Sequence, residues 1–238
     1  MPESQAHGKS WEDDIKSYIF WLTKEECDSI PHTARHDIPG ELNRLDNGVN
    51  ISIKTTGSDT VCMADVSRVC ENVGNGEQIH AIILMYKQNK SKTTKKLYRI
   101  IEIDLTNSRE LLFGTATIEE INELVAYVKS IPKDVTAAHR ATYKRMAKEI
   151  SAKNGGYISY APKVDSKGQR RVQCSISKFS KFVKEHPERI IAESQSGEFR
   201  GGTITEEIVS PPRKRNKKAV SIENAPLSTP SESGSEPH

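Results

Sequence analysis

The strongest constraint on the fold is a pair of apolar runs, IHAIILMYK at 79–87 and LYRIIEIDL at 97–105. Each run has the length of a strand and is rich in branched aliphatic residues, which favours a strand over a helix. The polar stretch NKSKTT lies between them. The two runs therefore predict a β-hairpin in the interior of the protein.

Other segments extend this into a mixed architecture. Apolar and polar residues alternate over 49–54, and the turn-like TTGSD leads to a second apolar run, TVCMADV, so an earlier hairpin is expected. Helical periodicity and capping residues predict the remaining elements. We expect helices at 11–26, from Thr117 to near Pro132, at 137–152 and at 177–186, with short strands at 157–162 and 170–176. This order predicts an α/β (α+β) fold, a mixed central β-sheet flanked by helices.

Hydrophobic periodicity stops near residue 195, which sets the expected domain boundary. The 238 residues suffice for one domain of ordinary size, predicted at 1–195, followed by a disordered tail at 196–238 that is rich in Gly, Ser, Pro and Glu. The tail contains PPRKRNKK at 211–218, typical of a nuclear localisation signal. No apolar run approaches the roughly 18 residues of a membrane span, so we expect an intracellular protein, nuclear in a eukaryotic host, with no membrane partner.

A strand-borne lysine beside acidic residues is the first indication of chemistry. If Ile51 and Ile53 face the core, the two-residue period places Ser52 and Lys54 together on the opposite face, and Asp46 lies just ahead of the strand. Carboxylate oxygens can hold a magnesium ion while a lysine orients an attacking water or offsets phosphate charge. The arrangement points to metal-dependent hydrolysis of a phosphodiester.

Asp46, Lys54 and Thr55 resemble the Asp-x6-Glu-x-Lys-Thr motif of the PD-(D/E)xK nuclease superfamily, the restriction-endonuclease-like fold, in the form used by mismatch-repair nicking endonucleases and related restriction enzymes. Ser52 stands where the motif has its glutamate, and the spacing is one residue shorter. The resemblance covers about residues 10–105 in element order. It implies a Mg²⁺-dependent deoxyribonuclease in which Asp46 is a metal ligand, Lys54 is the catalytic lysine, and Glu12 is the acidic residue that many members carry on the first helix.

Further carboxylates could complete the metal site. Glu102 and Asp104 alternate with apolar residues, so both lie on one face of their strand. Asp65, near the end of TVCMADV, lies just past the strand expected there and could join them. Each candidate also has a simpler explanation. Glu12 can favour the dipole of its helix, Asp46 can serve the turn Asp-Asn-Gly, and Glu102 and Asp104 can lie on a solvated face.

Two clusters of basic residues favour DNA as a partner. One is the lysine-rich hairpin of Lys87, Lys90, Lys92, Lys95 and Lys96. The other is the turn within PKVDSKGQRRVQCSI, whose side chains can reach phosphates and base edges. The candidate DNA-binding residues of this turn are Lys163, Lys167, Gln169, Arg170, Arg171 and Gln173. The net charge of +3 is too small to indicate a nucleic-acid partner by itself.

The favoured hypothesis is therefore a divalent-metal-dependent DNA endonuclease, in which Asp46 with Glu102 or Asp104 holds Mg²⁺ and Lys54 assists the attacking water. A restriction-type enzyme acting as a homodimer is compatible with it. Two alternatives stay open: a non-catalytic nucleic-acid-binding module, which Ser52 favours, and an interaction domain of a replication or packaging assembly.

Overall fold

The fold is built around a mixed five-stranded sheet, which we call sheet A. The computed structural model describes residues 3–31, 33–89, 91, 94–165 and 167–209. Strand β1 (Asn50–Thr56) runs parallel to β3 (Ile79–Gln88), which pairs antiparallel with β4 (Thr94–Asp104). The far edge of β4 pairs with β7 (Ile190–Ser194) and β10 (Glu207–Val209). The predicted β3–β4 hairpin and the mixed α/β architecture are confirmed.

A second, antiparallel sheet, sheet B, has the order β2–β6–β5. Its strands are β2 (Thr60–Asp65), β6 (Arg170–Ser177) and β5 (Ile158–Val164). The hairpin expected over 49–65 is wrong, because β1 and β2 enter different sheets. Their apolar faces explain this: Ile51 and Ile53 pack in one core, whereas Val61 and Met63 pack in the other. The turn between the strands is closed by the Thr56 hydroxyl, which donates to the carbonyl oxygen of Thr60 at 2.8 Å.

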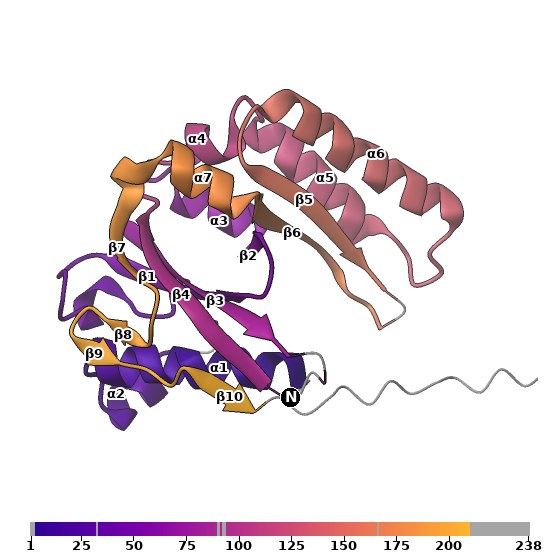
Figure 1. Ribbon diagram of the computed structural model, residues 1–238. Helices are drawn as coiled ribbons and strands as arrows, with labels where there is room; N and C mark the ends of the chain where they lie inside the picture. Colours follow the sequence, from indigo (N-terminus) through magenta and orange to yellow (C-terminus); the bar gives the residue numbers. More distant parts are fainter. Residues whose placement is uncertain (1–2, 32, 90, 92–93, 166, 210–238) are drawn as a thin grey trace, which may run out of the picture.

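Both faces of sheet A are covered. Figure 1 shows α1 on one side, whereas sheet B and the helices α3, α5 and α6 lie on the other side. The α-helices are α1 (Glu3–Asp14), α2 (Lys24–Ser29), α3 (Val66–Asn72), α4 (Arg109–Phe113), α5 (Ile118–Ser130), α6 (Ala137–Asn154) and α7 (Phe179–Glu185). A π-helical turn at Ile15–Ile19 extends α1, and 3-10 turns occupy Gly40–Leu42 and Pro187–Arg189. The helix predicted at 11–26 is therefore interrupted, because Thr23 begins a new helix with its own capping box to Glu26. No helix among the described residues is long and apolar enough to cross a bilayer.

The two faces of sheet A border two separate apolar cores. Ala81, Ile83 and Ile101 face the larger core, which sheet B and α5 complete. Ile82 and Ile100 face the smaller core, which includes Trp11 of α1. Successive side chains of a strand alternate between the faces, so the parity of a residue decides which core it borders.

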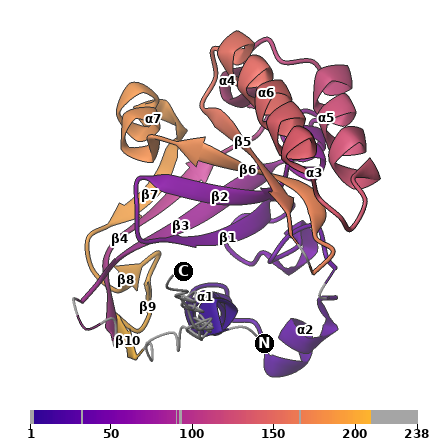
Figure 2. The same cartoon turned by 90° about the vertical axis from the view of Figure 1, so that its right-hand side faces the viewer.

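The fold extends to Val209, past the boundary expected at 195. Short strands β8 (Glu198–Phe199), β9 (Gly202–Thr203) and β10 follow β7, and Figure 2 shows them beside α1. The indole of Trp11 donates to the carbonyl oxygen of Thr205 at 2.7 Å, which ties this segment to α1. Strands of two or three residues leave no periodic signal, so the sequence gives no indication of them. The expected tail from residue 210 onward, with its basic run at 211–218, lies outside the described residues.

Candidate metal centre

Three side chains from separate segments converge on the face of sheet A that borders the smaller core. His80 is on β3, Glu102 is on β4, and Asp46 lies in the loop before β1. His80 pairs with Asp104 and Glu102 pairs with Ile82 across the two strands, so His80 and Glu102 share one face. One ligand atom from each of the three residues lies within 4.8 Å of the others. This group could hold a metal ion.

Glu102 is the buried centre of the group, with only 1% of its surface exposed. Its Oε1 lies 2.8 Å from Nδ1 of His80, and its Oε2 accepts a hydrogen bond of 3.0 Å from Nη1 of Arg200. An ionised carboxylate only accepts hydrogen bonds, so the His80 Nδ1–H is the donor in this contact. A buried carboxylate needs such partners, because its desolvation in an apolar environment is costly.

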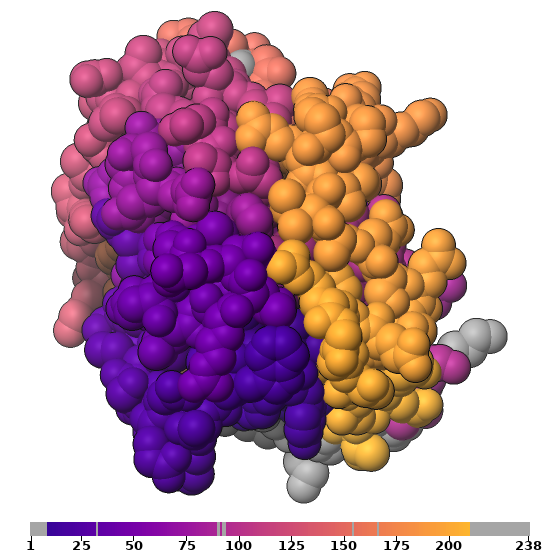
Figure 3. Space-filling model, turned by 90° about the vertical axis from the view of Figure 1, so that its left-hand side faces the viewer, coloured from indigo at the N-terminus to yellow at the C-terminus, as the bar shows by residue number. Residues whose placement is uncertain are grey.

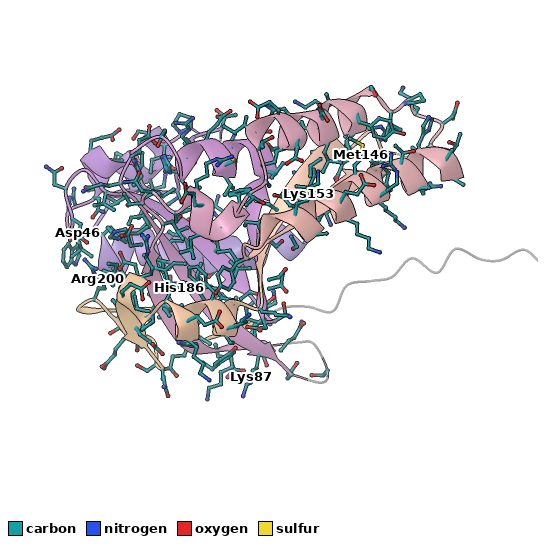
Figure 4. The ribbon with its side chains drawn as sticks, turned by 90° about the horizontal axis from the view of Figure 1, so that it is seen from above. Asp46, Lys87, Met146, Lys153, His186 and Arg200 are labelled. Atoms are coloured by element: carbon teal, nitrogen blue, oxygen red, sulfur yellow. The ribbon has the colours of Figure 1, made fainter. Side chains whose placement is uncertain are left out.

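Arg200 joins the two carboxylates of the group. Its Nη2 lies 2.5 Å from Asp46 Oδ2, while Nη1 holds Glu102. Figure 4 shows Asp46 and Arg200 next to each other. Figure 3 looks at this side of the molecule, where the orange and yellow C-terminal segment lies against the indigo and purple N-terminal part. Two carboxylates therefore face one guanidinium.

The loop that carries Asp46 is held by Asn43, a buried side chain. The Asn43 Oδ1 accepts from the backbone N–H of Asp46 at 2.9 Å, and its Nδ2 donates to the carbonyl oxygen of Val49 at 2.8 Å. Gly48 closes the loop at a φ of 88°, a conformation that favours glycine. Asp46 therefore serves a turn with its backbone, as one sequence interpretation expected, while its carboxylate reaches the site.

Asp104 shares the face of Glu102, as expected, but lies beside the group of three. Its Oδ1 is 4.0 Å from Nε2 of His80 and accepts from the backbone N–H of Thr106 at 2.7 Å. Its Oδ2 is 3.6 Å from Nη1 of Arg189. Asp104 therefore borders His80 but does not belong to the cluster of three ligand atoms.

The other acidic candidates lie elsewhere. Glu12 forms an ion pair with Lys16, at 2.6 Å between Oε1 and Nζ. Asp65 begins α3, and its Oδ1 accepts from the backbone N–H of Ser67 at 3.2 Å. Glu12 thus pairs with a residue one turn further along the chain. Asp65 was expected to join Glu102 and Asp104, but it lies at the end of β2 in sheet B and outside the group of three ligand atoms.

Lys54 does not reach the group either. It pairs with Ile83 of β3, which borders the larger core, so its side chain lies on the face of sheet A opposite His80 and Glu102. Its Nζ lies 3.0 Å from Oδ2 of Asp37, an acid that the sequence did not single out. The expectation that Lys54 shares one site with Asp46 and Glu102 is therefore wrong.

The β5–β6 hairpin presents the expected basic side chains in part. Lys163, Lys167, Gln169 and Arg171 are exposed. Arg170 instead anchors the hairpin, because its guanidinium donates to four backbone carbonyl oxygens at 2.6–2.8 Å, including those of Ile131 and Pro132 after α5. Gln173 is half-buried and pairs with Asp65 of β2.

Sequence reasoning missed His80 and Arg200. His80 lies inside an apolar run, two residues before Ile82, so both side chains lie on the same face of β3. Because Ile82 pairs with Glu102, the only signal in the sequence was that His80 would face the same side as Glu102. Arg200 lies in the segment assigned to the tail, where no pattern in the sequence indicated a functional residue.

No protein-family model, no curated protein and no solved structure matches this chain.

Proposed function

We propose that this protein is a divalent-metal-dependent DNA endonuclease whose ion is held by Asp46, His80 and Glu102. The observation that supports the proposal is the convergence of these three ligand atoms from three segments within 4.8 Å. A purely structural ion pair would need only Arg200 and one acid. Here two carboxylates share one guanidinium, and an imidazole beside them offers a further ligand atom.

The donor set suits a divalent ion of intermediate softness. Magnesium favours oxygen ligands, while imidazole and carboxylate together also suit manganese. Such an ion polarises a phosphoryl oxygen and lowers the pKa of a bound water. Asp104 Oδ1 lies 4.0 Å from Nε2 of His80, so this carboxylate borders the proposed site. We therefore expect activity with Mg²⁺ and stronger binding of Mn²⁺.

DNA is the proposed substrate because exposed basic side chains lie on two hairpins. Lys87 and Lys96 are exposed on the β3–β4 hairpin, whose Lys90 and Lys92 lie outside the described residues, and the β5–β6 hairpin adds the exposed side chains given above. In Figure 1 the β3–β4 and β5–β6 hairpins both run toward the right-hand side of the molecule. His80 is the second residue of β3, so the last residue of the strand, Gln88, lies about 26 Å along it from the site, at 3.3 Å per residue. That span corresponds to about eight base pairs of DNA at ~3.4 Å each. DNA bound at both places would therefore have to run along the sheet.

The cleavage experiment compares Asp46→Asn with Asp65→Asn. We expect Asp46→Asn to slow Mg²⁺- or Mn²⁺-dependent cleavage of duplex DNA by at least about a hundredfold, or ~2.7 kcal/mol of barrier. Asp65→Asn is the matched control, because asparagine also caps helices and Asp65 lies away from the site. The proposal fails if the full chain cleaves none of a panel of duplexes with either ion, or if Asp46→Asn cleaves as fast as the parent.

The main alternative is a non-catalytic DNA-binding module, which the distance between hairpins and site favours. A salt titration tests the DNA contact in either case. The slope of log affinity against log salt should fall by about 1.8 in Lys163→Ala/Arg171→Ala, because each phosphate contact contributes about 0.9. The control is Lys144→Ala/Lys148→Ala, which removes two exposed charges from α6. Equal slopes for the two variants would remove the β5–β6 hairpin from the DNA interface.

A further inference from the structure

Arg200 occupies the oxygens that a metal ion would need. Glu102 uses Oε1 for His80 and Oε2 for Arg200, and Asp46 uses Oδ2 for the same guanidinium. The arginine side chain is 16% exposed, so it is largely shielded from water. A guanidinium held between two carboxylates in such a place is a strong competitor for any other cation.

Arg200 lies in a tight turn between two anchored residues. Arg200 has a φ of 47°, and the following Gly201 has a φ of 84°. A residue with a side chain rarely adopts this left-handed conformation, so the arrangement carries a cost that the ion pairs offset. Phe199 and Ile204 are 3% and 2% exposed and anchor the segment on both sides of the turn. We therefore expect a new side-chain orientation of Arg200 to affect mainly the β8–β9 turn.

We propose that Arg200 exchanges partners: it closes the site in the ion-free chain and, when a divalent ion takes Asp46 and Glu102, it binds a phosphate oxygen of the substrate. This inference rests on the proposed function. The guanidinium suits both roles, because its fixed fork of donors matches carboxylate and phosphate alike. Once the ion neutralises the carboxylates, the guanidinium of Arg200 is released from them. It then lies beside the place where a phosphodiester would meet the ion.

The test measures Mn²⁺ affinity of the full chain by calorimetry, without DNA. Arg200→Ala should bind Mn²⁺ at least about tenfold more tightly than the parent, since a cation that competes for the ligands is gone. Arg189→Ala is the matched control. It removes an arginine that pairs with Asp104 on the same face but touches neither Asp46 nor Glu102. Its Mn²⁺ affinity should stay within about threefold of the parent, because only the general charge of the face has changed.

A second measurement follows the substrate role of Arg200. In the parent, saturating Mn²⁺ or Ca²⁺ should tighten binding of a short duplex, and Arg200→Ala should lose most of that increment. If Arg200→Ala melts well below the parent, Arg200→Gln replaces it, because glutamine keeps a donor for Glu102 without the charge. Both measurements then use a folded chain.

The outcomes separate the two proposals. Mn²⁺ binding that is equally tight in the parent and in the Arg200 variants overturns the exchange and leaves the metal site standing. An equal gain of Mn²⁺ affinity in Arg189→Ala also overturns the exchange, because the gain would then reflect the general loss of positive charge from this face. The absence of Mn²⁺ binding in every variant overturns the metal site itself. A selective gain together with loss of the ion-dependent DNA increment supports the exchange.

Discussion

The two faces of sheet A carry two different groups of charged residues. On the face of the larger core, Asp37 accepts from Lys54 Nζ at 3.0 Å, from Ser52 Oγ at 3.3 Å and from the backbone N–H of Ile53 at 2.6 Å. On the other face, Glu102 lies between His80 and Arg200. The first group is partly open, whereas Glu102 is 1% exposed.

The two groups differ in how many acids share one cation and in the burial of the central acid. In the first group one acid meets one lysine, and three donors satisfy one carboxylate oxygen. In the second group two acids meet one arginine, and an imidazole adds a further ligand. An edge-strand ion pair explains the first group completely. The second group could hold a metal ion, because it brings three ligand atoms together.

Glu102→Ala should give the largest loss of stability. It leaves Arg200 and His80 without their buried partner, and breaking a buried pair costs about 3–5 kcal/mol. Chemical denaturation of the parent and the variant measures the difference. Glu193→Ala is the control, because this exposed acid also pairs with an arginine, Arg99, at 2.9 Å. A loss below about 1 kcal/mol, the range of surface pairs, would contradict the burial of Glu102.

Asp37→Ala should have an intermediate effect. It removes three hydrogen bonds and leaves the backbone N–H of Ile53 without its acceptor, at a cost of about 1.5–3 kcal/mol. Lys54→Ala removes only the charged partner and should cost less than about 1 kcal/mol. The same denaturation experiment compares both variants. Equal losses would mean that the ion pair, rather than the backbone contact, is what Asp37 contributes.

Lys54→Ala should have the smallest effect on chemistry. Since Lys54 lies on the face opposite His80 and Glu102, we expect metal-dependent cleavage to stay within about threefold of the parent, below ~1 kcal/mol of barrier. Initial cleavage rates at saturating DNA measure this. A loss near a hundredfold would instead place the active site at Asp37, Ser52 and Lys54.

Elements with local signals were predictable. The β3–β4 hairpin, α5 with its capping box, and the shared face of Glu102 and Asp104 follow from periodicity and capping alone. The sequence did not indicate that Lys54 and Glu102 lie on opposite faces of the sheet. That placement depends on the pairing of Ile51 with His80, across strands that are distant in sequence. Arg200 reaches the site through two-residue strands, whose formation depends on tertiary contacts such as that of Trp11 with Thr205.

The central claim is that His80, with Asp46 and Glu102, binds a divalent ion, and pulsed electron paramagnetic resonance of bound Mn²⁺ tests it most directly. A coordinated imidazole couples its nitrogen to the Mn²⁺ electrons. His36→Gln is the matched control, because His36 is a shielded histidine that lies beside a different acid, Glu77, and burial lowers the pKa of His36. The account predicts a nitrogen coupling in the parent and in His36→Gln that is lost in His80→Gln. A parent without nitrogen coupling, or a coupling that survives in His80→Gln, would contradict it.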